Sequence, residues 1–179
     1  VLFKRFADID GIDIEVDTAD ADEFINCVKY LGKSWGGINL EDIAAPECFI
    51  IEQKLSEKLD IPVFHDDQHG TAIVATAGVL NALTITGRDI KDFKMVVNGA
   101  GAAGIACVEL LKAMGMPSNN VIMCDRKGVI SKNRNDLDQW KSAHAVDTPH
   151  KTLKDALKAA DIAFGLSAKG AFTNEMMLS

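Results

Sequence analysis

The stretch FKMVVNGAGAAGIACVELLKAMG (93–115) constrains the fold of this chain more than any other segment. The continuous apolar run at 93–98 is typical of a strand buried on both faces. The turn Gly99-x-Gly101-x-x-Gly104 follows at once, and a helical apolar pattern extends to 115. Because a buried strand, a glycine turn and a helix begin a parallel βαβ unit, the stretch predicts a sheet covered by helices.

Strand and helix patterns alternate along the rest of the chain. Strands are predicted at 12–16, 36–40, 61–65, 121–125 and 162–167, and helices at 18–32, 46–59, 70–87 and 152–160. This alternation predicts an α/β fold with a Rossmann-type parallel sheet. Residues 1–67 hold 16 Asp and Glu against 6 Lys and Arg, whereas 68–179 are slightly basic. We therefore expect a Rossmann-type domain over 68–179, incomplete at its C-terminus, preceded by part of another α/β domain over 1–67.

Composition excludes several classes of partner. No apolar run reaches the roughly 18 residues that a membrane span needs. An acidic half disfavours nucleic acid or an anionic membrane surface and suits a bound cation. Cys27, Cys48, Cys107 and Cys124 are widely spaced among apolar neighbours, so we expect buried free thiols in a reducing compartment such as the cytoplasm.

Two acidic pairs each follow a predicted strand: Glu41 and Asp42 after GGINL, and Asp66 and Asp67 after IPVFH. Parallel strands deliver their carboxyl ends to one edge of a sheet, so both pairs are expected at the same rim. Carboxylates that converge there repel unless a cation holds them, and oxygen ligands select Mg²⁺ or Mn²⁺. The alternative is that Asp42 and Asp67 cap the helices that follow. Spacing alone leaves these two interpretations level.

His65 and His69 have a spacing that can bind zinc on one helical turn. They belong to different predicted elements, which favours supporting or surface roles. His144 and His150 lie in a polar loop and predict nothing.

The glycine turn predicts a dinucleotide site, because glycines let a pyrophosphate approach the backbone amides at a helix start. The turn consists of Gly99, Ala100, Gly101, Ala102, Ala103 and Gly104. A second strand ends at Asp125, 21 residues after Gly104, about where a ribose-binding acid belongs. Asp125 favours NAD because its carboxylate repels a 2′-phosphate. Arg126 and Lys127 would offset that repulsion, so NADP stays open. GLSAKGAF (165–172) fits a second cofactor contact and an ordinary turn equally well.

Five segments resemble the malic enzymes, the decarboxylating malate dehydrogenases, and together they cover nearly the whole chain. They are FKRFADIDGIDIEVD, NLEDIAAPECF, PVFHDDQHGTAI, NGAGAAGIA and GLSAKGAFT. HDDQHGTA together with LEDIAAPE is highly specific for the short bacterial-type members. The resemblance implies oxidative decarboxylation of (S)-malate to pyruvate and CO₂, with reduction of NAD or NADP and a need for Mg²⁺ or Mn²⁺. It also implies a homodimer or a higher homo-oligomer.

The resemblance further implies residue roles. Glu41, Asp42 and Asp67 would hold the metal, and Asp66 would support the catalytic lysine. Thr71, Asn98 and the glycine turn would lie along the cofactor. Segment 1–67 would then be the C-terminal part of a metal- and substrate-binding domain.

Two departures from the family pattern affect the expected activity. The lysine base is expected just before VLFKRFA and the tyrosine acid further upstream, and Tyr30 and Lys33 lie on the wrong helix to replace them. We therefore expect an internal fragment that is inactive alone. Two other functions stay open: a non-catalytic dinucleotide-binding fragment, and a metal-free dehydrogenase of the amino-acid or shikimate type. The second would leave Glu41 and Asp42 unexplained.

Overall fold

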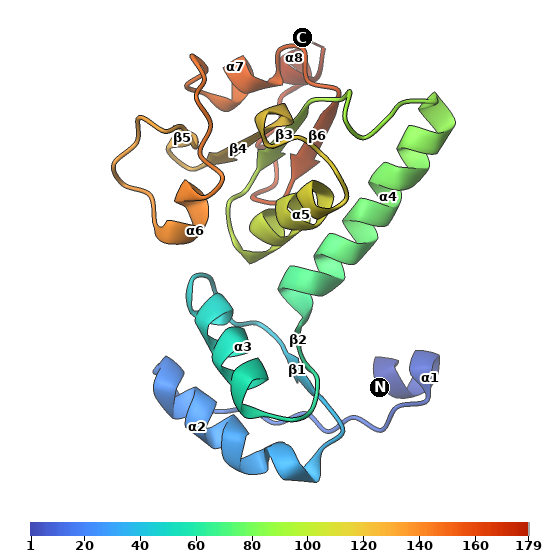
Figure 1. Cartoon of the computed structure of the whole chain (residues 1–179), viewed down its shortest axis with the longest axis vertical. Coiled ribbons are helices and arrows are strands. Elements are labelled where there is room, and N and C mark those ends of the chain that lie inside the picture. Colours follow the sequence, from blue (N-terminus) through green and yellow to red (C-terminus); the bar gives the residue numbers. More distant parts are fainter. Residues whose placement is uncertain (179) are drawn as a thin grey trace.

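The computed structural model describes residues 1–178 and shows two lobes joined by one long helix (Figure 1). The smaller lobe holds α1 (Leu2–Ala7), α2 (Ala21–Leu31), a 3₁₀ turn (Gly32–Ser34), β1 (Ile38–Leu40), α3 (Glu47–Lys58) and β2 (Val63–His65). A π-helical turn (Asp66–Gly70) then leads into the connecting helix α4 (Thr71–Thr86). The larger lobe holds β3 (Met95–Asn98), α5 (Ala102–Ala113), a 3₁₀ turn (Ser118–Asn120), β4 (Val121–Asp125), β5 (Gly128–Val129), α6 (Gln139–Ser142), α7 (Leu153–Leu157), β6 (Ile162–Gly165) and α8 (Asn174–Met177).

The strands form two separate sheets. In the smaller lobe β1 and β2 pair in parallel, with Leu40 opposite His65. In the larger lobe the order is β5-β4-β3-β6, and β3 is parallel to both β4 and β6. Only the two-residue edge strand β5 is antiparallel. The predicted α/β class and Rossmann-type parallel sheet are therefore confirmed.

The predicted strand at 12–16 is wrong. Residues 8–20 form no helix or strand, and Ile12 and Ile14 are exposed at 70% and 49%. Alternating hydrophobicity makes a strand only where a neighbouring strand pairs with its backbone, and none lies here. Helix α2 also begins later than predicted. Asp20, rather than Thr18, caps it by accepting hydrogen bonds from the backbone N–H groups of the next turn.

The sequence patterns also miss α1, β5 and α6. Each has six residues or fewer, which is too short for a period to emerge. The remaining predicted elements are present, with ends shifted by a few residues.

Each lobe has its own hydrophobic core. In the larger lobe, Val97 and Met123 face α5 and pack with Leu111, whereas Val96 and Cys124 face the opposite side, towards α7. The central strand β3 is thus buried on both faces, as its continuous apolar sequence predicts. The smaller core joins α2, α3 and β1 through Ile25, Val28, Leu40, Ile51 and Leu55.

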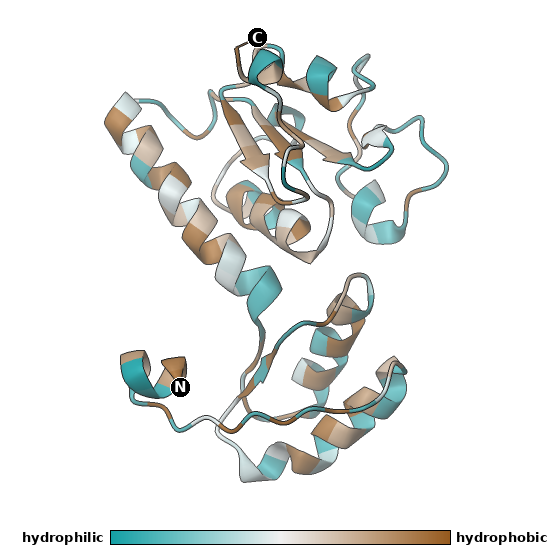
Figure 2. Ribbon diagram, turned by 180° about the vertical axis from the view of Figure 1, so that it is seen from behind, coloured by the Kyte–Doolittle hydropathy of each residue, from teal (hydrophilic) through white to brown (hydrophobic). Residues whose placement is uncertain are grey.

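Helix α4 consists largely of apolar residues, coloured brown in Figure 2, and several of their side chains are exposed. One face is buried, and Ala72 there packs with Ala106 and Cys107 of α5. Ile73 and Ile85 on other faces are 55% and 85% exposed. By length and composition alone, the helical segment Asp66–Thr86 passes the test for a membrane span. A groove of about 400 Å³ with mainly apolar walls lies between α4 and β6.

The four cysteines are free, as predicted, and three of them are buried. Desolvation raises the pKa of Cys48 to about 11 and that of Cys124 to about 12. Burial also raises the pKa of Cys107. Cys27 is the partly exposed one.

We expect a disulfide reagent at pH 8 to modify Cys27 rapidly in the folded chain and the other three thiols only on unfolding, because thiolate formation needs solvent. Stopped-flow absorbance with and without urea measures this. Cys27→Ser should abolish the fast phase. More than one rapidly modified thiol per folded chain would contradict the burial.

Since folding favours the neutral form of the three buried thiols, the free energy of unfolding should fall as the pH rises above the ordinary thiol pKa of 9.0.

Candidate functional site

The two acidic pairs lie at the ends of neighbouring parallel strands, as predicted. Leu40 and His65 are paired, so Glu41 and Asp66 are the next residues beyond them at the same edge of the sheet. Asp42 has a φ of 54°, which turns the chain away from the strand direction directly after β1. The backbone therefore delivers both pairs to one rim.

Neither aspartate of the capping interpretation caps a helix. The N-cap residue of α3 is Pro46 and that of α4 is Gly70, and neither helix has a capping side chain. The π-helical turn is capped by the His65 side chain. Within residues 1–178, Asp42, Asp66 and Asp67 have no side-chain hydrogen bond or ion pair, while Glu41 accepts one hydrogen bond from Asn39 at 2.8 Å. The helix-cap alternative is therefore wrong for Asp42 and Asp67.

The carboxylates are not gathered into a coordination shell. Within residues 1–178, no three Asp, Glu, His or Cys side chains are grouped so that they could hold a metal ion. The Glu41 carboxylate is bound to the Asn39 side-chain amide. The chemistry of the donor set still fits a hard ion, because three carboxylates share the rim with no cationic side chain bound to any of them. Glu41, Asp42 and Asp67 as metal ligands stay a prediction.

The turn that carries Asp66 and Asp67 is held by Glu52 of α3, whose side chain is only 14% exposed. Its Oε1 accepts from the His65 backbone N–H at 3.1 Å and lies 2.6 Å from His69 Nε2. Its Oε2 accepts from Gln68 Nε2 at 3.3 Å. The sequence analysis did not predict this network.

His65 and His69 have different partners and do not form a shared metal site. His65 is fully buried, and its Nδ1 accepts from the Gln68 backbone N–H at 3.3 Å, while its Nε2 has no partner within the described residues. His69 binds Glu52. Gly70 closes the turn, because a Cβ there would collide with the Asp66 carboxylate.

The glycine turn shows where a side chain is forbidden and where the surface is open. Gly99 has a φ of 128°, and a Cβ on it would collide with the Leu166 carbonyl. A Cβ on Gly104 would collide with the Gly99 carbonyl oxygen, whereas one on Gly101 meets no atom within 4 Å. Gly104 therefore serves the packing of the turn, and Gly101 leaves room at the start of α5.

The segment 165–172 lies beside this turn. The Asn98 side chain donates to Ser167 Oγ at 2.8 Å, and the Leu166 N–H donates to the Asn98 carbonyl at 2.9 Å. This placement at the carboxyl ends of β3 and β6 is where a dinucleotide binds in open parallel sheets.

Asp125 is bound by a residue that the sequence patterns missed. Arg134 donates to both Asp125 oxygens, at 2.8 and 3.0 Å, and to Asp136 at 2.9 Å. Burial alone raises the pKa of Asp125, but the hydrogen bonds from Arg134 and from the Lys127 N–H outweigh it and lower that pKa. The pKa of Arg134 is raised by its two carboxylate partners. Since Arg134 lies in a polar loop nine residues after Asp125, no periodic pattern marks the contact.

His144 is a second residue missed by sequence reasoning. It is 6% exposed, with Lys112 Nζ at 3.0 Å from its Nδ1 and Glu109 Oε1 at 3.6 Å from its Nε2. Burial and the Lys112 charge lower the pKa of His144. It joins the loop after α6 to α5 and lies outside the predicted site.

The two halves of the predicted site face each other. The Asp66–Gly70 turn contacts α5, the helix that the glycine turn opens. Thr71, predicted to lie along the cofactor, is the first residue of α4 at this junction. The acid-bearing rim and the glycine turn therefore meet where the lobes adjoin (Figure 1).

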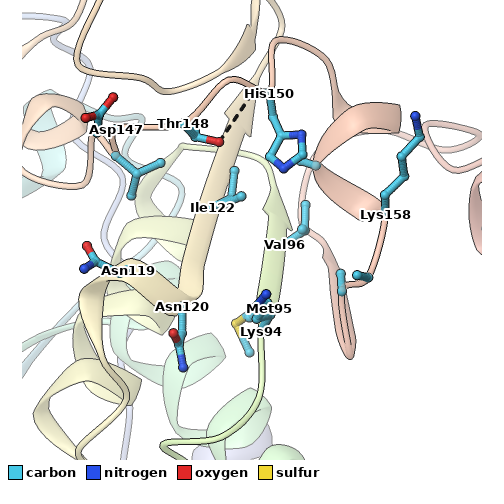
Figure 3. A pocket seen from close by; sticks show the side chains of 14 residues that line it. Lys94, Met95, Val96, Asn119, Asn120, Ile122, Asp147, Thr148, His150 and Lys158 are labelled. Carbon is cyan, nitrogen blue, oxygen red and sulfur yellow. Dashed lines mark hydrogen bonds between the residues drawn. The ribbon is translucent and has the colours of Figure 1, made fainter.

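A cavity of about 180 Å³ lies elsewhere, at the amino ends of β3 and β4 (Figure 3). Lys94, Asn119, Asn120, Asp147, His150 and Lys158 are among its lining residues. Ligands of parallel sheets bind at the carboxyl ends, so this cavity is at the wrong end of the strands for the cofactor.

Comparison with known proteins supplies the family. A family profile described as the malic enzyme NAD-binding domain matches residues 68–178. The chain belongs to the malic enzyme family. An NADP-dependent malic enzyme of Rhizobium meliloti is 67% identical over 100% of this chain and 24% of its own length. An NAD-dependent malic enzyme of the same organism is 47% identical over 99% of this chain and 23% of its own length.

Solved structures agree with this family. The NAD-dependent malic enzyme of Thermotoga maritima is 44% identical with a TM-score of 0.92, covering 99% of this chain and 48% of that one. The malic enzyme of Entamoeba histolytica is 34% identical with a TM-score of 0.93, covering 98% and 40%. The chain thus spans less than half the length of these malic enzymes.

Alanine at Gly104 and at Gly101 should have different effects. Gly104→Ala forces the Gly99 carbonyl to move and should lower the melting temperature. Gly101→Ala should change the free energy of unfolding by less than about 0.5 kcal/mol, as at ordinary surface positions, yet weaken dinucleotide binding by crowding the pyrophosphate. Thermal unfolding and titration of the reduced cofactor by fluorescence measure the two effects. Equal dinucleotide affinity in Gly101→Ala and the unaltered chain would contradict the assignment of this turn.

Proposed function

We propose that this chain is the metal- and dinucleotide-binding part of an enzyme that oxidatively decarboxylates (S)-malate to pyruvate and CO₂. One observation carries the proposal: the turn bearing Asp66 and Asp67 contacts α5, which begins at the glycine turn. Carboxylates with no internal partner therefore lie next to a dinucleotide-type turn, which suits a dehydrogenase that also needs a cation. Membership of the malic enzyme family supports the substrate.

The chain's own residues have three tasks in this reaction. The backbone amides at the start of α5 bind the pyrophosphate, and Gly101 keeps that surface free of a side chain. Glu41, Asp42 and Asp67 would hold the cation. Asp66 has no partner within the described residues and would orient the ammonium group of the lysine base.

Two bound groups would supply the remaining chemistry. Mg²⁺ or Mn²⁺ would act as a Lewis acid that polarises the oxygen on the carbon being oxidised. The nicotinamide would accept the hydride.

We propose NADP as the cofactor, although Asp125 alone favours NAD. Arg134 and the Lys127 N–H occupy three of the roughly four acceptor positions of the Asp125 carboxylate, which leaves little to receive ribose hydroxyls. Arg126 is exposed and has no partner within residues 1–178, so its guanidinium is free for a 2′-phosphate. The NADP-dependent relative at 67% identity, against 47% for the NAD-dependent one, points the same way.

We further propose a cytoplasmic homo-oligomer. Free thiols suit a reducing compartment. The uncovered apolar face of α4 suits burial against more protein, either the rest of the polypeptide or a second copy.

In the full-length enzyme, Asp67→Ala should lower Mn²⁺ affinity by more than about 100-fold, because loss of a ligand exceeds the effect of losing a residue that only orients one. Electron paramagnetic resonance of free Mn²⁺ measures this, beside malate-dependent NADP reduction. Asp60→Ala removes an exposed carboxylate of the same lobe and should change neither value. Full turnover by Asp67→Ala in the presence of a chelator refutes the proposed chemistry.

Arg126→Ala in the full-length enzyme should lower kcat/KM for NADP by about 10- to 100-fold, the effect of losing one charge-assisted hydrogen bond, and leave the value for NAD within about twofold. The initial-rate ratio of the two cofactors measures it. Lys91→Ala, which removes an exposed cation at the other end of the sheet, is the matched control. An unchanged ratio in Arg126→Ala would exclude Arg126 as the 2′-phosphate contact.

A further inference from the structure

The Asp66–Gly70 turn depends on a contact from outside its own segment. Its backbone forms a π-helical turn, and its local side-chain contacts are the 3.3 Å hydrogen bond from the Gln68 N–H to His65 Nδ1 and the contact between the Phe64 and His69 rings. Asp66 and Asp67 contribute nothing to holding it, because neither side chain has a partner within residues 1–178. The directions of these two carboxylates must therefore be set by their neighbours.

Glu52 binds those neighbours on both sides of the aspartate pair. It receives the backbone N–H of His65, which precedes the pair, at 3.1 Å. Its carboxylate oxygens also bind Nε2 of Gln68 at 3.3 Å and Nε2 of His69 at 2.6 Å, and both residues follow the pair. Both carboxylate oxygens are used. One side chain from α3 thus fixes the two ends of the segment within which Asp66 and Asp67 lie.

Burial of the Glu52 carboxylate costs free energy, and the packing of α3 gives no reason for a charged residue there. Glu52 lies next to Ile51 on α3, its side chain is 14% exposed, and it has no Lys or Arg partner within the described chain. Burying a charge without a cation destabilises a protein unless hydrogen bonds compensate. Every compensating bond comes from the segment 65–69, which contains the aspartate pair, so this segment is what Glu52 serves.

The negative charge of Glu52 also acts on the same thiol as the negative charge of Asp67. After desolvation and a backbone contact, the negative charges of Glu52, Glu47 and Asp67 contribute to the raised pKa of the buried Cys48 thiol. Glu52 and Asp67 therefore both lie near enough to Cys48 for their charges to act on its thiol. Glu52 adds a negative charge near the rim, which helps to attract a cation, while its own oxygens are occupied by hydrogen bonds.

We propose that Glu52 is a positioning residue that directs Asp66 and Asp67 into the site through its bonds to His65, Gln68 and His69. The effect on metal binding rests on the proposed function. The positioning of the turn by Glu52 rests on the hydrogen bonds alone. Glutamine at this position keeps the size of the side chain but replaces one acceptor oxygen by a donor, so it loses at least one of the three contacts.

The test uses the full-length enzyme with Glu52→Gln, His69→Leu and two matched controls. Glu57→Gln makes the same change five residues along α3, at an exposed position bound only to Gln53. Glu47→Gln removes a charge that also acts on Cys48 but forms no hydrogen bond to the turn. Hydrogen exchange of the peptide covering 65–70 is measured without metal, and Mn²⁺ affinity by paramagnetic resonance. NADP affinity and melting temperature are measured alongside.

We expect faster exchange of the turn and Mn²⁺ affinity about 10- to 100-fold weaker in Glu52→Gln, as for other residues that orient metal ligands. His69→Leu should shift both values in the same direction by less. NADP affinity should stay within about twofold in both variants, and saturating Mn²⁺ should restore kcat. Both controls should match the unaltered enzyme.

Unchanged exchange and unchanged Mn²⁺ affinity in Glu52→Gln would overturn the positioning role. Joint loss of Mn²⁺ and NADP binding with a lower melting temperature would also overturn it, because that pattern shows general unfolding. An unaltered enzyme that binds no Mn²⁺ would instead refute the proposed function, and the exchange of the 65–70 peptide would then decide the role of Glu52 alone.

Discussion

The backbone pairing of β1 with β2 decides where the two acidic pairs, Glu41 with Asp42 and Asp66 with Asp67, can lie. Two three-residue strands run in parallel, and a slip of one residue would send each following side chain to the opposite face. The pairing of Leu40 with His65 puts both acidic pairs at one edge. A metal site assembled this way needs no long-range contact between the acids themselves. The placement of the proposed ligands at one edge follows from these backbone hydrogen bonds.

The glycine turn achieves a comparable result by close packing. Gly99 and Gly104 are required because other backbone atoms occupy the space of their missing side chains. The Leu166 carbonyl, which blocks a side chain on Gly99, belongs to the segment after β6, so the turn is shaped by a strand more than 60 residues away. The packing of the glycine turn thus depends on the pairing of β3 with β6.

The sequence predicted the features that depend on local pattern and failed on those that depend on distant partners. The buried strand β3, the helices α3 and α5 and the position of Asp125 follow from periodicity and spacing. Residues 12–16 have the alternation of a strand but no neighbour to pair with. The contacts Arg134–Asp125 and Glu52–His69 join residues 9 and 17 positions apart through loops and separate elements. The only sequence sign of the second was a charged residue beside Ile51 on the buried side of α3. The assignment of Glu41, Asp42 and Asp67 as metal ligands comes from the family motifs and stays a prediction.

The placement of the Asp66–Gly70 turn has a mechanical consequence. The chain passes between the lobes once in residues 1–178, through this turn and α4 (Figure 1). A change in the angle between the lobes that pivots in this turn would move the residues flanking Asp66 and Asp67. Because α4 runs on from the turn as one stiff rod, a small rotation at its base becomes a large sweep at its far end. Closure of the two lobes about this turn would therefore change the direction of the Asp66 and Asp67 carboxylates.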